Sequence, residues 1–191
     1  SLAGLYAQTG ETKRALSLWQ EAIILSEQAG DIQGKAAILY KMAGIIAQQG
    51  DPHRALSLVQ EALTNYKQTK DSKGEAAAIS LIAHLTAQQG DVSRALELWQ
   101  QALGLFEQIY DVHSKAGILH NMALAFAAQG QVQKAIDLWQ QSLAIKQQIG
   151  DIPGKANTLS MLASVYARQG DTDKALELWN DSLAVYEQLE D

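Results

Sequence analysis

The chain has 191 residues, of which 47% are hydrophobic and 19% are charged, and its formal net charge at pH 7 is −6. It contains no cysteine, which excludes disulfides and thiolate chemistry and fits a reducing compartment, so we expect a cytoplasmic protein. The charge is spread without a basic stripe, and no apolar run approaches the roughly 18 residues of a membrane span. Neither nucleic acid nor a membrane is therefore an expected partner.

One pattern recurs every 40 residues along the whole chain. The period is marked by five glycines: Gly10, Gly50, Gly90, Gly130 and Gly170. It is marked again by five alanines: Ala15, Ala55, Ala95, Ala135 and Ala175. A fixed period of this length is typical of one supersecondary unit stacked on copies of itself. We therefore expect a solenoid, in which each unit contacts only its neighbours, and not a globule with one central core.

Residues 1–30 form a partial first repeat. Ser1 to Thr9 matches the second half of a repeat element (compare Lys41 to Gln49), which indicates a piece excised from a longer protein. Four repeats follow at approximately 31–70, 71–110, 111–150 and 151–191. We expect all of them to belong to a single array over residues 1–191.

The repeat 31–70 shows two stretches of apolar residues spaced three and four apart, as on one face of a helix. Gly50 can adopt the left-handed conformation that closes the first helix. Asp51 is then the expected N-cap of the second helix, with Pro52 at its first position. The aspartates at the start of the next three repeats stand at one phase: Asp71, Asp111 and Asp151. The sequence thus predicts an all-α superhelix of antiparallel helix pairs joined by short turns.

Each second helix carries a large residue at one fixed position. The residues in this slot are Trp19, Val59, Trp99, Trp139 and Trp179. Four tryptophans at helical phase could serve as stacking platforms for a ligand. Because the same slot accepts valine, the sequence favours core packing.

The order of small and large residues around the Gly-Asp turn carries a family resemblance. In one copy it reads Leu39, Met42, Ala43, Ile46, Gly50, Asp51, Ala55, Val59 and Ala62. In another it reads Leu119, Met122, Ala123, Phe126, Gly130, Ala135, Trp139 and Ser142. This pattern resembles the tetratricopeptide repeat and covers essentially the whole chain. Its period is longer than the family's usual 34 residues and is similar to the 40-residue variety found in kinesin light chains, Pins-type spindle adaptors and bacterial signalling proteins.

The resemblance implies that the first helices of successive repeats line a concave groove that binds an extended or helical peptide. The groove positions implied in the repeats 31–70 and 71–110 are Tyr40, Lys41, Gly44, Gln48, Ser80, Leu81, His84 and Gln88. Those implied in the last two repeats are His120, Asn121, Leu124, Asn157, Ser160, Ser164 and Arg168. These positions vary between copies while the core does not, as expected of a binding surface, although drift on an unselected surface would look the same.

Two functions follow from this resemblance. The first is a protein–protein interaction module that binds a partner protein or peptide in the groove. The second is a structural spacer, or a segment that assembles head to tail, with no groove ligand. The groove offers small, amide and hydroxyl groups, with Lys41 as its only lysine, so we expect no specific binding of acidic C-terminal peptides.

No catalytic or cofactor motif emerges from the sequence. The segment from Gly30 to Ala36 is only superficially similar to a phosphate loop, because it has too few residues between its glycines and Ala in place of Ser or Thr. The histidines lack the spacing and acidic neighbours of a metal site, and for His84 and His120 polar groove residues are favoured over a metal or acid–base pair. We therefore expect no enzyme, cofactor or metal.

Both ends of the array are expected to expose apolar surface. The second helix around Leu176 to Leu189 has no following repeat in this sequence, and the first repeat lacks half a helix. Such faces favour end-to-end self-association.

Overall fold

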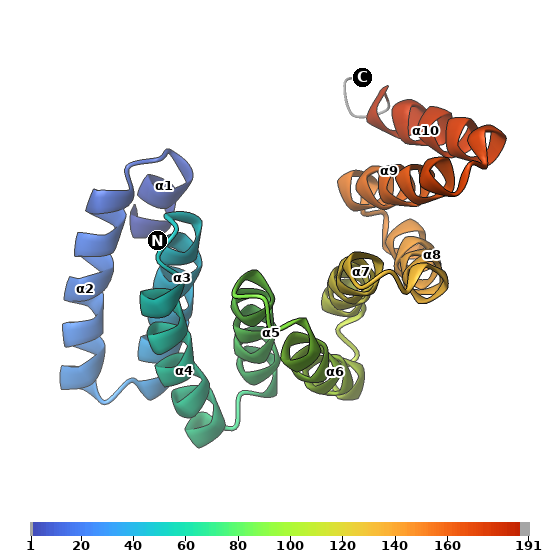
Figure 1. The fold of residues 1–191 in the computed structure, drawn as a ribbon. Coiled ribbons are helices and arrows are strands. Elements are labelled where there is room, and N and C mark those ends of the chain that lie inside the picture. Colours follow the sequence, from blue (N-terminus) through green and yellow to red (C-terminus); the bar gives the residue numbers. More distant parts are fainter. Residues whose placement is uncertain (1, 188–191) are drawn as a thin grey trace. The chain divides into compact units, whose positions relative to one another are not determined.

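The computed structural model describes residues 2–187, and within that range it contains ten α-helices and no strand (Figure 1). The first five helices are α1 (Leu2–Gln8), α2 (Thr12–Ala29), α3 (Ile32–Gln48), α4 (Pro52–Thr69) and α5 (Ser72–Gln88). The others are α6 (Val92–Gln108), α7 (Val112–Ala128), α8 (Val132–Ile149), α9 (Ile152–Gln169) and α10 (Thr172–Glu187). The predicted all-α architecture is confirmed, as is the short first helix followed by nine longer ones.

The helices belong to two compact units, Ser1–Leu105 and Phe106–Asp191, and the boundary falls within α6. In the first unit, α1 packs on α2, α2 on α3, α3 on α4, and α5 on both α3 and α4. In the second unit, α7 pairs with α8, α8 packs on α9, and α9 pairs with α10 (Figure 1). Neighbouring helices are thus neighbours in sequence, as expected of stacked hairpins. None of the helices described here combines the length and the apolar character that crossing a bilayer requires.

The predicted helix caps are present. Asp51 begins α4 with its Oδ1 accepting a hydrogen bond of 3.1 Å from the backbone N–H of Arg54, and Pro52 lies in the first turn. Gly50 has a φ of 83°, which is the left-handed conformation expected at the end of α3. The aspartates that cap the first helices of the four repeats in the same way are Asp31, Asp71, Asp111 and Asp151.

The turn after each second helix also needs a left-handed residue, and it does not always receive glycine. Gly30 and Gly150 occupy this position in two copies, with φ of 67° and 71°. Lys70 and Tyr110 occupy it in the other two, with φ of 57° and 56°. Non-glycine residues rarely adopt this conformation, so the tight turn between repeats is imposed by the packing of the helices on both sides.

Small residues allow the helices to approach one another closely. The alanines at the recurring contact positions are fully buried: Ala36, Ala43, Ala55, Ala83, Ala95, Ala123, Ala135, Ala156, Ala163 and Ala175. The large residue of each second helix fills the space beside them, with Trp19, Trp99 and Trp139 between 2% and 4% exposed and Val59 at 0%. Core packing of this slot is confirmed for these four copies. Trp179 differs, with 41% of its surface exposed.

Candidate functional site

The expected groove positions lie on the first helices of the repeats, and we call them the first-helix strip. In the first unit they come from α3 and α5: Tyr40, Lys41, Gly44, Gln48, Ser80, Leu81, His84 and Gln88. In the second unit they come from α7 and α9: His120, Asn121, Leu124, Asn157, Ser160, Ser164 and Arg168. None of these residues is buried in the core, and seven are exposed: Lys41, Gln48, His84, Gln88, Leu124, Asn157 and Arg168.

Within the first unit, the strip mixes an aromatic base with polar side chains. Tyr40 is half-buried against the cluster formed by α3, α4 and α5, and this burial raises the pKa of its hydroxyl above the ordinary value. Lys41 beside it is exposed. On α5, the side chains of His84 and Gln88 are 3.0 Å apart and hydrogen-bonded, one helical turn from each other. Within this unit the strip thus combines a half-buried aromatic ring with exposed groups that donate and accept hydrogen bonds.

Within the second unit, Leu124 stands out because it is an apolar strip residue with 42% of its surface exposed. The strip residues of α9 are partly engaged with each other and with α10. The Ser160 hydroxyl lies 2.9 Å from that of Ser182, and the Ser164 hydroxyl donates to the Ser160 carbonyl at 2.8 Å. Asn157 is exposed, so its amide remains available to a ligand.

His120 belongs to a polar cluster that joins three helices of the second unit. The Nζ of Lys146 on α8 donates to Thr158 Oγ1 on α9 at 2.9 Å. Thr158 Oγ1 donates to the Gly154 carbonyl at 2.9 Å, and His120 Nδ1 on α7 lies 3.3 Å from the same oxygen. A hydroxyl has one proton and two acceptor sites. With its proton on Gly154, Thr158 accepts from both Lys146 and His120, which places a proton on Nδ1 of the histidine.

Burial controls the charge of this cluster. It lowers the pKa of His120 to about 4, with a smaller contribution from the nearby Lys146 ammonium. Burial also lowers the pKa of Lys146, against the opposing effect of the Asp151 carboxylate. The His120 ring lies 6.3 Å from the Trp139 ring, between centroids, with its plane tilted by 58°. His120 is therefore a neutral, packed donor at pH 7 and not a free proton acceptor.

Two members of this cluster, Lys146 and Thr158, are not among the residues that the sequence pattern singled out. They are 7% and 0% exposed. The signal that reveals them is the register of the repeats. Lys146 stands where other copies have Tyr66 and Phe106, and Thr158 stands where other copies have isoleucine or alanine. A lysine in an aromatic core slot requires a hydrogen-bonding partner nearby.

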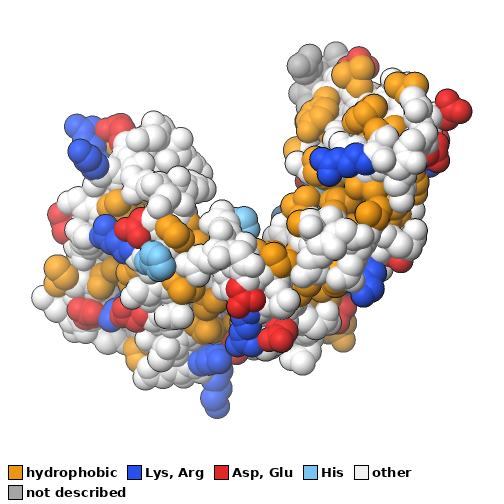
Figure 2. Space-filling model, viewed as in Figure 1, with side chains coloured by type: hydrophobic (Ala, Val, Ile, Leu, Met, Phe, Trp, Pro, Cys, Tyr) orange, Lys and Arg blue, Asp and Glu red, His pale blue; other side chains and the backbone are white. Residues whose placement is uncertain are grey.

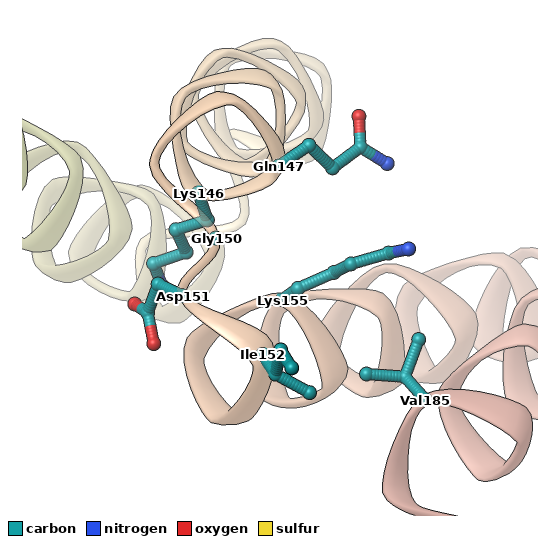
Figure 3. Close-up of a pocket in the computed structure, with 7 residues that line it drawn as sticks. All are labelled: Lys146, Gln147, Gly150, Asp151, Ile152, Lys155 and Val185. Atoms are coloured by element: carbon teal, nitrogen blue, oxygen red, sulfur yellow. The ribbon is translucent and has the colours of Figure 1, made fainter. Parts of the chain in front are cut away.

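A cavity of about 150 Å³ opens beside this cluster, where α8 turns into α9 (Figure 3). Its lining residues are Lys146, Gln147, Gly150, Asp151, Ile152, Lys155 and Val185. Figure 3 shows Gln147 and Lys155 extending in a similar direction from the two helices. The other turns of this kind carry an ion pair instead, Lys35 with Glu27 and Lys115 with Glu107, each at 2.7 Å. The cavity at the α8–α9 turn is therefore more positively charged than the equivalent cavities at the turns before α3 and α7.

The candidate site is thus a set of surface positions on the first helices. Between residues 2 and 187, no three histidine, aspartate or glutamate side chains gather in a way that could hold a metal ion. The two strip histidines lie on helices of different units, His84 on α5 and His120 on α7. Within each unit, the strip presents exposed and partly buried side chains on a packed helical base.

Solved structures with the same fold include three of different origin. BtubC (BKLC) from P. vanneervenii shares 21% identity at a TM-score of 0.86, with 99% of this chain and 78% of that chain covered. A Podosopora anserina protein, described as a kinesin light chain with nearly identical TPR-like repeats, shares 23% identity at a TM-score of 0.75, with coverage of 99% and 93%. A Rap protein complexed with Competence and Sporulation Factor shares 18% identity at a TM-score of 0.86, and this chain spans 53% of its length.

None of the curated proteins matches the chain in sequence. The tetratricopeptide repeat family matches it in three overlapping windows, residues 34–108, 74–148 and 114–188. These windows take in every complete repeat, and they follow the same 40-residue period as the glycines and alanines described above. The chain therefore belongs to the tetratricopeptide repeat family.

Proposed function

We propose that this chain is a protein-interaction module that binds a peptide or a partner protein along the first-helix strip. Family membership supports interaction over catalysis, because tetratricopeptide repeats form extended surfaces from stacked helices. The Rap protein of similar fold is described in complex with Competence and Sporulation Factor, which supports a role in binding for such helix pairs.

The observation that carries the proposal is the contrast between the strip and the core beneath it. Across the four complete repeats, the contact alanines Ala43, Ala83, Ala123 and Ala163 are identical and fully buried. The residue that follows each alanine is a strip position, and the four copies carry Gly44, His84, Leu124 and Ser164 there. The same register position thus carries a different side chain in each copy, two of them in each unit. Such variation can discriminate between ligand sequences without any change in the fold.

Leu124 is the strip residue with the largest expected contribution to affinity. Its side chain is 42% exposed, whereas the other large apolar residues of the strip, Tyr40 and Leu81, are partly buried. Covering a leucine side chain contributes about 1.5–3 kcal/mol when burial is complete. His120 and Asn121 lie one turn before it on α7. We infer that Leu124 receives an apolar side chain of the ligand, while the neighbouring amide and imidazole groups orient the ligand backbone.

The test is a selection of random peptides on the 191-residue chain, followed by titration calorimetry of the peptides recovered. Leu124→Asp should reduce their affinity at least tenfold, which corresponds to about 1.4 kcal/mol. Val112→Asp is the matched control, because Val112 is 49% exposed on the same helix but lies outside the strip. Equal affinity for both variants and the unmodified chain would contradict the proposal, as would a selection that recovers no peptide.

Acidic C-terminal peptides provide a second test of ligand class. Lys41 is the only lysine of the strip, and it lies on α3 of the first unit, whereas Asn121 and Asn157 lie on α7 and α9 of the second. We infer that a terminal carboxylate has no multidentate site within either unit. Tight binding of such a peptide that is lost in Lys41→Ala would overturn this inference and leave the strip itself as the binding surface.

A further inference from the structure

Four large apolar side chains lie exposed on one face of α10. They are Leu176, Trp179, Leu183 and Tyr186, with exposed fractions of 52%, 41%, 57% and 45%. Figure 2 shows apolar side chains gathered on the visible face of the last two helices. A contiguous apolar patch of this kind is uncommon on a monomer and marks an interaction surface.

The register of the repeats shows what covers this face elsewhere in the chain. The residues 40 and 160 positions before Trp179 are Trp139 and Trp19, which are 2% and 4% exposed. Trp19 belongs to one core cluster with Met42 of the following helix α3, and Ile45 packs against that cluster. Trp139 belongs to one core cluster with Leu162 and Val165 of the following helix α9. The natural cover for Trp179 is therefore a first helix with apolar residues at these two register positions.

Such a helix is present at the other end of the same chain. Leu2 and Leu5 on α1 stand 40 residues before Met42 and Ile45, and 160 residues before Leu162 and Val165. Met42 and Leu162 are 3% and 2% exposed, whereas Leu2 and Leu5 are 59% and 55% exposed. The chain thus carries both halves of its own inter-repeat junction, and both halves are uncovered.

We propose that a second copy of this chain docks on α10, with its Leu2 and Leu5 packed against Leu176 and Trp179 of the first copy. The contact repeats the junctions already present at α2–α3 and α8–α9, so it needs no new kind of packing. It is heterologous, because different surfaces of the two copies meet, and it leaves one free face of each kind on every dimer.

The proposed contact is small. In the register of α3 and α9, the described residues of α1, Leu2–Gln8, face Leu176 and Trp179 and not Leu183 and Tyr186. In the internal junctions the first helix has 17 or 18 residues and covers the whole face. We therefore expect reversible association that grows with concentration, as for other small and transient interfaces.

The experiment is sedimentation velocity of the 191-residue chain over about a hundredfold range of concentration. The unmodified chain should show a rising mean mass. Trp179→Glu and the double variant Leu2→Glu/Leu5→Glu should each weaken self-association at least tenfold, and because these residues are exposed the fold should be retained. Tyr110→Asn is the matched control, since Tyr110 is 88% exposed, lies outside the junction register and has a left-handed backbone that asparagine tolerates.

Mixing the two impaired variants decides the geometry. Each keeps one intact face, so a mixture of Trp179→Glu with Leu2→Glu/Leu5→Glu should form dimers that grow no further. Self-association of Leu2→Glu/Leu5→Glu alone at the unmodified level would show two α10 faces meeting and would overturn the proposal. A monomer at every concentration, or equal weakening by Tyr110→Asn, would overturn it as well. Peptide binding along the strip should be unchanged in Trp179→Glu, which separates this result from the test of Leu124.

Discussion

Two inter-repeat junctions of this chain use the same register with opposite chemistry. At the junction of α4 and α5, three equivalent slots hold Tyr40, Tyr66 and Ala78. At the junction of α8 and α9, the same slots hold His120, Lys146 and Thr158. The register is the same in both, so the difference shows which side chains these three positions accept.

The α4–α5 junction is closed by aromatic packing. Tyr66 is 6% exposed, and burial is the main cause that raises its pKa to about 12, assisted by the Asp71 carboxylate and by Tyr40. Its ring lies over Gly74, where an added Cβ would come within 2.3 Å of a ring carbon. A side chain at this position would therefore force the ring to shift. The junction gains its stability from apolar contact.

The α8–α9 junction is closed by hydrogen bonds. Thr158 uses its hydroxyl proton and both acceptor sites, on Gly154, Lys146 and His120. A buried lysine is tolerated because this oxygen accepts from it and because Asp151 opposes the loss of its charge. Nearby, Ser142 and Ser182 donate to the Ala116 and Ala156 carbonyls at 2.8 and 2.9 Å, at a register position where the first unit has alanine. These hydroxyl and ammonium groups enter the core together with their partners, whereas the buried Nε1 of Trp139 has none.

The largest expected effect comes from breaking the polar junction at its centre. Thr158→Val keeps the shape but removes the oxygen that accepts from Lys146 and His120, so a buried ammonium loses its partner. The free energy of unfolding should fall by about 2–4 kcal/mol. Urea denaturation followed by circular dichroism measures this. Ile118→Val, at the same register on α7 and 2% exposed, is the control and should cost about 1 kcal/mol; equal losses would mean that Thr158 serves only to fill space.

A transplant of the apolar set into the polar junction should have the opposite sign. His120→Tyr, Lys146→Tyr and Thr158→Ala together reproduce the residues of the α4–α5 junction, and Gly154 stands at the same register position as Gly74. Replacing a buried charged network by matched apolar residues is neutral or stabilising, here by up to about 3 kcal/mol. The same urea denaturation measures it. A triple variant clearly less stable than the unmodified chain would show that the two junctions differ in backbone as well as in side chains.

The repeat period accounts for how much of this could be read from sequence. Helix starts at the capping aspartates, the left-handed turn at Gly50 and the buried slot of Trp139 follow from local rules that each copy repeats. The fold class and the helix order needed nothing more. Turns closed by Lys70 and Tyr110 were not predictable, because neither residue favours a positive φ and the packing of neighbouring helices imposes it.

The polar cluster escaped prediction for a different reason. Lys146 does not stand out in the sequence, since lysines are seldom buried, and its burial depends on a threonine 12 residues later and a histidine on another helix. His120 was predicted as a strip residue, and the structure places it in a cluster as well. Only the alignment of copies, which sets Lys146 against Tyr66 and Phe106, carries the signal.

Acid should weaken the polar junction more than the aromatic one. Folding lowers the pKa of His120 from 6.5 to about 4, so between these values the unfolded chain binds a proton that the folded chain does not. The contribution of neutral His120 to the free energy of unfolding is then fully present above about pH 6.5 and is lost as the pH falls toward 4. The loss is on the order of 1–2 kcal/mol, because the ring is only half-buried. Denaturation of the transplant variant, which lacks His120, should show a smaller slope over this window. If the free energy of unfolding changed with pH identically in both proteins, a group other than His120 would be taking up the proton.

The smallest expected effect concerns the ion pair that the polar junction lacks. Gln147 faces the cavity where Glu27 and Glu107 stand in other copies, and within the described residues Lys155 has no acidic partner (Figure 3). Gln147→Glu should form this pair and raise the free energy of unfolding by about 0.2–0.5 kcal/mol at low salt, since such pairs are partly exposed. The gain should vanish in Gln147→Glu/Lys155→Met and at about 1 M salt. A larger gain that survives salt would mean that the new carboxylate acts on the buried Lys146 instead. The stability of the polar junction would then be limited by the uncompensated charge of Lys146 and not by the hydrogen bonds of the cluster.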